Sequence, residues 1–166
     1  MTDTTNRLAL PLIAAGQAQK EITHNEALSL VDMLAQPVVQ SVAPAAVPVN
    51  PVLGACWIVG VGAGGVWAGY DGALACATAG GWRFASAFEG MSVWSLADQQ
   101  VVNRSGGTWV IGTVNARKIQ INGVQLLINR QPAIAGPSGG AVIDGEARAT
   151  IASLLAMMRI HGLIAV

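Results

Sequence analysis

The polar residues between positions 17 and 28 are the first candidates for chemistry in this chain. Within seven positions, the stretch QAQKEITHNEAL holds Lys20, Glu21, His24, Asn25 and Glu26. A helix would place Glu21 and His24 on one face, where both could ligate a metal ion. The second histidine of the chain is far away in sequence, and both cysteines lie in apolar runs. We therefore expect no metal site and read the stretch as a recognition or assembly helix.

Other arrangements that could catalyse a reaction are incomplete. The serines have no neighbouring histidine and acid of the kind that activates a nucleophile. A carboxylate pair for glycoside hydrolysis would have to come from Asp71, Glu89 and Asp98, which lie in turn-like contexts. The glycines at 60–65 form G-x-G-x-G before a strand-like run, which does not match a dinucleotide-binding loop. We expect a protein that is not an enzyme and uses no cofactor, and keep a polysaccharide-degrading enzyme as the least favoured alternative.

The composition indicates a protein that associates with copies of itself or with a partner. Charged residues make up 11% and hydrophobic residues 52% of the 166 residues, against about 25% and 45–50% in average soluble domains. With so few charges, part of the surface must be apolar, and apolar patches mark interfaces. The formal net charge is zero, and the chain has no basic tract, so we expect no nucleic-acid partner.

Membrane insertion and secretion are not expected either. Prolines and glycines interrupt the weakly charged stretch between Asp32 and Arg83, which argues against a membrane-spanning helix. Asp3 and Pro11 interrupt the N-terminal run that a signal peptide would need. Cys56 and Cys76 lie in apolar contexts, so we expect buried free thiols rather than a disulfide or a metal site.

The first segment, residues 1–53, is predicted to contain a tail, a helix and a proline-rich linker. Residues 17–36 show one apolar stripe with helical spacing, formed by Ala27, Leu30, Val31 and Leu34. His24 falls on the same stripe, which predicts a partly buried histidine. Pro37 ends the helix, because proline disfavours helical backbone in the residue before it. Residues 37–52 carry four prolines and are expected to be extended.

Residues 54–112 are predicted to form a small antiparallel β-meander with its own core. Five short apolar runs, each with a central tryptophan, are separated by glycine-rich or polar turns. Most of the tryptophans are expected to fill the core. Trp67 and Tyr70, next to the Asp71-Gly72 turn signal, are the first choices for an exposed glycan contact, because aromatic faces stack on sugar rings.

The last two segments are residues 113–141, a hairpin and linker, and residues 142–166, an oligomerisation helix. The hairpin is indicated by alternation around Asn122-Gly123, and the helix is predicted to start at Asp144 and end at Gly162. Spacings of four and three, the coiled-coil period, relate Ala147, Ile151, Leu154, Met158 and His161. Two heptads are marginal in isolation, so we favour a bundle between subunits over packing on the chain's own body.

Two parts of the sequence resemble known proteins. LPLIAAGQAQKEITHNEAL and the following GACWIVGVGAGGVWAGYDGALA resemble the domain of unknown function 2793, a family found in alphaproteobacterial prophages and gene transfer agents. That resemblance covers about residues 8–112. NRQPAIAGPSGG and DGEARATIASLLAMMRIHGLI are similar to the C-terminal ends of phage tail-fibre-type proteins, which are usually trimers.

Together these features predict an α+β protein, mainly antiparallel β. It would have an N-terminal helix, a β-meander body, a β-hairpin and a C-terminal helix that forms a bundle in a homotrimer. The resemblance implies a structural fibre or spike protein, made in the bacterial cytoplasm and located in a virion or gene-transfer-agent particle. The residues expected to dock on the particle are Gln17, Gln19, Lys20, His24, Asn25 and Glu26. Expected partners are its own copies, other particle proteins and host surface polysaccharide, the last also as an adhesin module.

Overall fold

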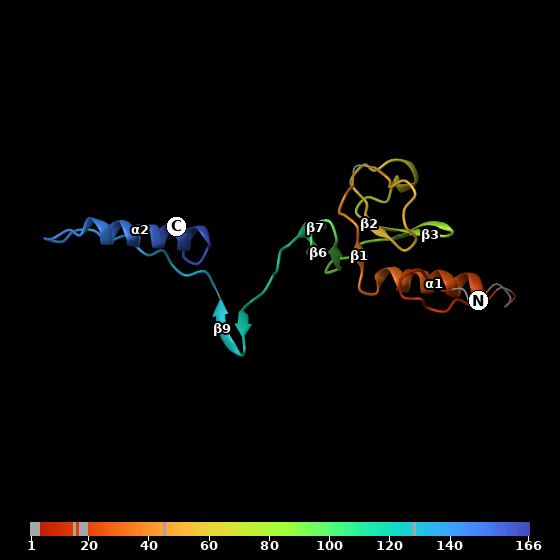
Figure 1. Cartoon of the computed structure of the whole chain (residues 1–166), viewed down its shortest axis with the longest axis horizontal. Helices are drawn as coiled ribbons and strands as arrows, with labels where there is room; N and C mark the ends of the chain where they lie inside the picture. Colours follow the sequence, from red (N-terminus) through yellow and green to blue (C-terminus); the bar gives the residue numbers. More distant parts are fainter. Residues whose placement is uncertain (1–3, 15, 17–19, 45, 128) are drawn as a thin grey trace. The chain divides into compact units, whose positions relative to one another are not determined.

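The computed structural model describes residues 4–14, 16, 20–44, 46–127 and 129–166 (Figure 1). The chain divides into two units, Met1–Thr113 and Val114–Val166. The predicted class, α+β with mainly antiparallel strands, is confirmed. Residues 1–53 and 54–112, which the sequence pattern separates, contribute to one core in the first unit. None of the helices in the described ranges is long and apolar enough to cross a membrane.

Helix α1, Lys20–Leu34, ends before Pro37 as predicted, but its buried face differs from the predicted stripe. Ala27 and Val31 are exposed, whereas Asp32 and Met33 are buried. Leu30 and Leu34, which belong to the predicted stripe, pack against the core. The N-terminal segment covers another side of the helix, and the hydrogen bonds described below hold that segment in place.

A four-stranded sheet has the order β1-β5-β6-β7. Its strands are β1 (Val38–Val39), β5 (Ser92–Ser95), β6 (Gln100–Ser105) and β7 (Thr108–Ile111). β1 comes from the predicted linker and pairs in parallel with β5, while the other pairs are antiparallel. The predicted turn at 103–108 lies between β6 and β7, around Gly106 and Gly107, which both have positive φ.

A three-stranded antiparallel sheet has the order β2-β3-β4. Its strands are β2 (Cys56–Ile58), β3 (Leu74–Thr78) and β4 (Gly81–Ala85). The outer edge of β2 is not left free, because Ile58 donates to the Ser41 carbonyl and accepts from the Ala43 N–H. The stretch that begins with β1 therefore bonds to both sheets and joins them.

Side-chain alternation along β2 and β3 creates two cores, one on each face of the three-stranded sheet. The first core contains Met33, Val39, Cys56, Ile58, Leu74, Cys76, Ala85, Met91, Val93 and Val102. The second, here called the tryptophan core, contains Trp57, Val59, Trp67, Ala75 and Ala77, with Trp82 and Phe84 packed against it. The first core lies where α1 and the two sheets meet, so it includes residues from all three.

One tryptophan run does not form the strand that its pattern suggests. Residues around Trp67 form a single 3-10 turn, η1 (Gly65–Trp67), inside the long connection from β2 to β3. The Asp71-Gly72 turn lies at the end of this connection, where Gly72 N–H donates to the Val59 carbonyl. It is therefore not the tip of a tight hairpin, although Asp-Gly favours that position.

The second unit begins with the predicted hairpin of β8 (Ile119–Ile121) and β9 (Val124–Leu127). Asn122 and Gly123 both have positive φ, 49° and 78°, as a two-residue type I′ turn requires. A register shift lies between Ile119 and Gln120. The prediction of a hairpin centred on Asn122-Gly123 is confirmed.

Helix α2, Gly145–Ile160, has the predicted signals at both ends. The Asp144 carboxylate accepts a hydrogen bond of 2.9 Å from the Ala147 N–H. At the other end Gly162, with a φ of 69°, donates to Arg159 O, and Leu163 donates to Met158 O. These two bonds form a Schellman motif, which needs a residue that tolerates left-handed backbone.

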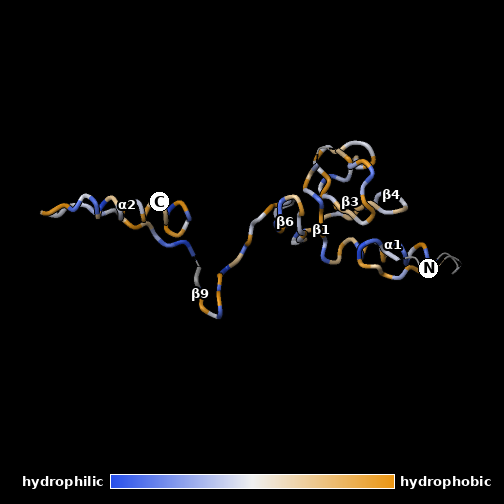
Figure 2. The backbone as a smooth tube through the Cα atoms, in the orientation of Figure 1, coloured by the Kyte–Doolittle hydropathy of each residue, from blue (hydrophilic) through white to orange (hydrophobic). Residues whose placement is uncertain are grey.

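The chain before α2 lies along the helix within the second unit. Arg159 Nη2 donates to the Ile134 carbonyl at 2.7 Å, and Arg148 Nη2 donates to the Gly139 carbonyl. Gln131 forms a parallel bridge with Ile164, which has 1% of its surface exposed. Leu155 is the buried residue of α2. This unit therefore has a thin core, and several apolar residues of the helix, a residue type drawn in orange in Figure 2, stay exposed.

Candidate functional site

Among the predicted docking residues of α1, Lys20 and His24 face solvent, whereas Asn25 and Glu26 bond to other parts of the first unit. Lys20 and His24 are exposed, and the His24 Nδ1 atom lies 2.9 Å from the Lys20 carbonyl oxygen. The prediction of a partly buried His24 is therefore wrong, because the helix turns this position toward solvent. Gln17 and Gln19 lie outside the described residues.

Asn25 and Glu26 make contacts within the first unit. The Asn25 side chain accepts from the Ile13 N–H and donates to the Ile13 carbonyl, both at 2.9 Å, and so ties the N-terminal segment to α1. Glu26 forms an ion pair of 2.7 Å with Arg83 Nε on β4. Because both carboxylate and guanidinium are partly exposed, solvent screens the pair, and such pairs contribute about 1 kcal/mol or less.

Asp32 is the central polar residue of this region, although no motif in the sequence marks it. It is 5% exposed, and its carboxylate accepts from Thr5 Oγ1 at 2.9 Å, Arg7 N at 3.0 Å and Leu8 N at 2.6 Å. Arg7 in turn donates to the carbonyls of Asp32, Met33 and Gln36 at the end of α1. The sequence signal was Arg7, which stands directly before a short apolar run, since helix C-termini attract cations.

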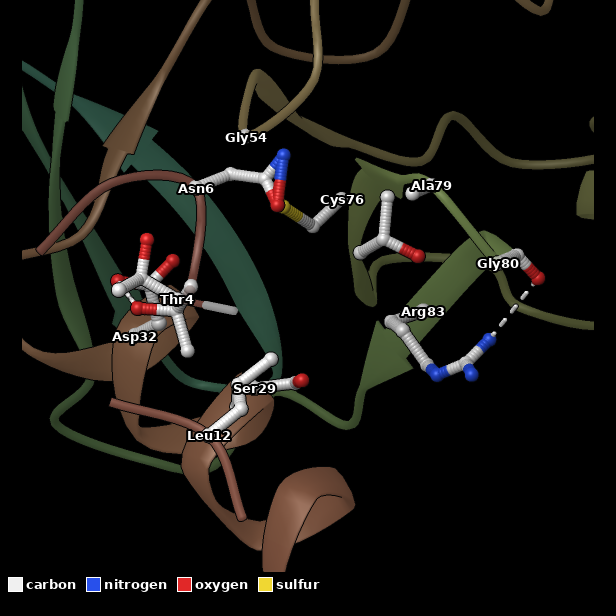
Figure 3. A pocket seen from close by; sticks show the side chains of 12 residues that line it. Thr4, Asn6, Leu12, Ser29, Asp32, Gly54, Cys76, Ala79, Gly80 and Arg83 are labelled. Carbon is white, nitrogen blue, oxygen red and sulfur yellow. Dashed lines mark hydrogen bonds between the residues drawn. The ribbon is translucent and has the colours of Figure 1, made fainter. Parts of the chain in front are cut away.

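A cleft of about 430 Å³ lies between the N-terminal segment, α1 and the three-stranded sheet (Figure 3). It is lined by Thr4, Thr5, Asn6, Leu12, Ser29, Asp32, Gly54, Cys76, Thr78, Ala79, Gly80 and Arg83. Asp32 and Arg83 already have partners in the chain, and the lining contains hydroxyls and an amide besides the Cys76 thiol. The cleft can donate and accept hydrogen bonds, and its reactive group is the thiol of Cys76.

Three tryptophans form the centre of the tryptophan core. The ring centroids of Trp57, Trp67 and Trp82 are 5.1–6.4 Å apart, and two of the three pairs meet edge to face. Trp67 has 0% of its surface exposed, and its Nε1 atom has no partner among the described residues. The prediction that Trp67 contacts a glycan on the surface is therefore wrong, because its ring is buried within the tryptophan core.

Tyr70 remains accessible, with 43% of its surface exposed. Its ring stacks on Phe84 at a centroid distance of 3.6 Å, which fixes its orientation. A pocket of about 170 Å³ beside it is lined by Gly69, Tyr70, Asp71, Gly72, Ala73, Ser86, Ala87 and Arg104. The Arg104 guanidinium lies 5.8 Å from the centroid of the Trp109 ring. The pocket is therefore lined by a cation that lies over an aromatic face.

The three carboxylates considered for glycoside hydrolysis each bind a turn. Asp71 accepts from the Gly62 N–H at 3.0 Å, and Glu89 accepts from the N–H groups of Gly106 and Gly107. Asp98 accepts from Ser95 Oγ at 2.5 Å. Each carboxylate thus has a local structural role. The described residues hold no cluster of three His, Cys, Asp or Glu side chains suited to a metal ion.

The predicted heptad stripe of α2 is largely exposed within the second unit. Ala147, Ile151, Leu154 and His161 are exposed, and Met158 is partly buried. The exposed fractions of Ile151, Leu154, Met157 and Ile160 are 43%, 52%, 49% and 82%. The helix therefore presents an apolar face that the described residues 114–127 and 129–166 do not cover.

Comparison with known sequences places the chain in a family without assigning an activity. No curated protein matches it. The match to a family pattern spans residues 24–110, from His24 on α1 to β7, and so includes the first core, the tryptophan core and the Tyr70 pocket. Because this match covers more than half of the sequence, the chain belongs to the family described as proteins of unknown function, DUF2793.

Proposed function

We propose that this protein is a non-enzymatic structural component of a phage or gene-transfer-agent-like particle, which acts in assembly and host attachment as a homotrimer. The observation that carries this proposal is the uncovered apolar face of α2. Ile151, Leu154 and Met157 are between 43% and 52% exposed on a capped, regular helix. An apolar helix face at heptad spacing is stable in water when it packs against other helices.

The second support is the division of roles along the chain. The helix α2 is attached to a hairpin and a long extended segment, whereas the first unit has two cores of its own. A fibre or spike subunit needs both a folded body and an element that joins its copies. Lys20 and His24, exposed on α1 of the body, are then available for contacts with other particle proteins.

Light scattering of the purified chain tests the trimer. We expect a particle of three times the chain mass of 17.0 kDa at micromolar concentration. A chain that ends at Thr113, the last residue of the first unit, should be monomeric, because it lacks α2. A full chain that stays monomeric at these concentrations would remove the support for a trimeric fibre.

A second candidate function, binding of host surface polysaccharide, is favoured by the pocket beside Tyr70. The pocket offers an oriented aromatic ring, the Asp71 carboxylate and the Arg104 guanidinium within about 170 Å³. Sugars are recognised by this combination of an apolar face with hydrogen-bonding groups. Arg104 would favour a sugar that carries a carboxylate.

A glycan array with bacterial capsule and lipopolysaccharide samples tests this second candidate. We expect Tyr70→Ala to weaken binding at least about fivefold, since it removes a stacking contact of about 1 kcal/mol or more. The matched control is Phe88→Ala, because Phe88 is an exposed aromatic residue, 60% accessible, that does not line the pocket. Equal binding by both variants, or binding by neither parent nor variants, would count against it.

A further inference from the structure

The two cysteines of the chain are direct cross-strand partners. Cys56 on β2 lies opposite Cys76 on β3 in the antiparallel register. Both side chains point into the first core, with 1% and 4% of their surface exposed. Both thiols are free in this structure. The two sulfur atoms therefore share one face of the same strand pair.

The backbone hydrogen bonds near Cys56 and Cys76 show whether the two residues form a hydrogen-bonded or a non-hydrogen-bonded pair. Ala77 donates to the Ala55 carbonyl and Val59 donates to the Ala73 carbonyl, so the flanking positions form the hydrogen-bonded pairs. The Cys56 carbonyl points away from β3 and accepts from the Gln40 N–H. Since the two kinds of pair alternate along an antiparallel ladder, Cys56 and Cys76 form a non-hydrogen-bonded pair.

This position suits a disulfide. Residues opposite each other in a non-hydrogen-bonded pair have Cα atoms about 4.5 Å apart. Their side chains lie closer together than those of a hydrogen-bonded pair. Disulfides span Cα distances of about 4.4–6.8 Å. The bond can thus form with a small adjustment of the side chains, and the ladder between β2 and β3 stays intact.

The surroundings of the two thiols differ, and Cys76 is the one that lines the cleft. The hydrogen bond from Cys56 lowers the pKa of the Cys76 thiol, and the positive charge of Arg7 acts in the same direction, while burial opposes both. The same hydrogen bond, together with burial, raises the pKa of Cys56. Cys76 also lines the cleft of about 430 Å³, and Figure 3 shows its side chain on the side of the cleft where Asn6 lies.

We propose that Cys56 and Cys76 form a reversible disulfide by exchange with a low-molecular-weight disulfide that reaches Cys76 through the cleft. The Cys76 thiolate attacks the small disulfide, forms a mixed disulfide and releases one small thiol. Cys56 then loses its proton and attacks the Cys76 sulfur, which releases the second small thiol. Two protein thiols are oxidised to one disulfide while one small disulfide is reduced to two thiols.

The bond would close the loop from Cys56 to Cys76, which contains the glycine-rich stretch, η1 and Tyr70. A cross-link stabilises a fold by restricting the unfolded chain. A protein made in a reducing cytoplasm would gain this restraint after it reaches an oxidising environment. The inference concerns the first unit alone and holds whether or not the chain is a trimer.

The test uses the full chain, treated with glutathione disulfide or with dithiothreitol. We expect the oxidised chain to lose both titratable thiols, to become lighter by two hydrogen atoms, and to run as a single chain on a non-reducing gel. Because the sequence has two cysteines, this mass identifies the bond. Calorimetry should show a Tm for the first unit that is higher by about 10 °C than in the reduced chain.

Single variants separate the roles of the two thiols. Cys56→Ser should accumulate a glutathione adduct on Cys76, whereas Cys76→Ser should leave Cys56 unmodified as long as the chain is folded. Circular dichroism of each variant shows whether it is folded. The parent chain decides the proposal without them: two thiols that persist in the folded protein, stable glutathione adducts, or dimers linked by a disulfide would overturn it.

Discussion

At the scale of single residues, Asp32 holds the N-terminal segment against α1. Three donors from residues 5–8 converge on one buried carboxylate. A buried charge is stable when hydrogen bonds satisfy it, and the bonds from Thr5, Arg7 and Leu8 do so here. Arg7 also ties the segment to α1, because its guanidinium donates to backbone carbonyls at the C-terminal end of the helix. The segment before α1 is therefore part of the folded body.

We predict that Asp32→Ala lowers the free energy of unfolding by about 2–4 kcal/mol, because three donors lose a charged acceptor in a buried place. Urea unfolding followed by circular dichroism measures this. Glu26→Gln is the matched control, since it removes a carboxylate from the same helix whose ion pair with Arg83 is partly exposed. We expect Glu26→Gln to lower the free energy of unfolding by about 1 kcal/mol or less. Equal effects of the two substitutions would contradict the assigned role of Asp32.

Whether a single side chain is buried could not be predicted reliably from the sequence, because burial depends on which other segments cover that side chain. The helical pattern placed His24 beside Ala27 and Val31, but all three are exposed because the N-terminal segment and the sheets occupy other faces of α1. The sequence pattern likewise placed most tryptophans in the core but could not show that Trp57 and Trp82 enclose Trp67. Both outcomes depend on contacts between residues far apart in sequence.

Among the elements, helix α2 is capped at both ends and has an exposed apolar face. The Asp144 cap and the Schellman motif at Gly162 satisfy backbone groups at both ends. Leu155 and the two arginines at 148 and 159 attach one side of the helix to residues of its own unit. The side that carries Leu154 and Met157 is left exposed within that unit.

We predict that Leu154→Glu converts the proposed trimer to a monomer, because three charges would be brought together in the apolar seam of the proposed bundle. Sedimentation velocity of the full chain measures this. Ala156→Glu is the matched control, since Ala156 is exposed and lies about 160° around the helix from Leu154. Both substitutions keep a good helix former. A trimer that survives Leu154→Glu, or that is lost equally with Ala156→Glu, would show that another surface joins the subunits.

Elements that are marked by proline, turn or capping residues could be predicted from the sequence. Elements that depend on pairing between residues far apart in the sequence could not. The end of α1, the hairpin at Asn122-Gly123 and both ends of α2 follow from Pro37, the Asn-Gly turn, Asp144 and Gly162. The two-residue strand β1 was read as linker, because its partner β5 is more than fifty residues away. The 3-10 turn at Trp67 arises where the long connection folds over the sheet, which no local pattern encodes.

At the scale of the whole molecule, the chain combines two units of different character. The first unit has two cores on either side of one sheet and carries the family match. The second unit has a hairpin, an extended segment and a helix with a thin core. The first unit ends at Thr113, next to residue 112, where the predicted meander ends after the last tryptophan run. The family relation was equally visible, since its signature is local.

The distribution of aromatic residues has a practical consequence for work in solution. All five tryptophans, the tyrosine and both phenylalanines precede Thr113. Intrinsic fluorescence therefore reports on the first unit, and three of its emitting rings form one buried cluster. The second unit is optically silent at these wavelengths. A fluorescent probe placed on α2 would give a separate signal, so that unfolding of the first unit and changes at α2 can be followed in the same sample.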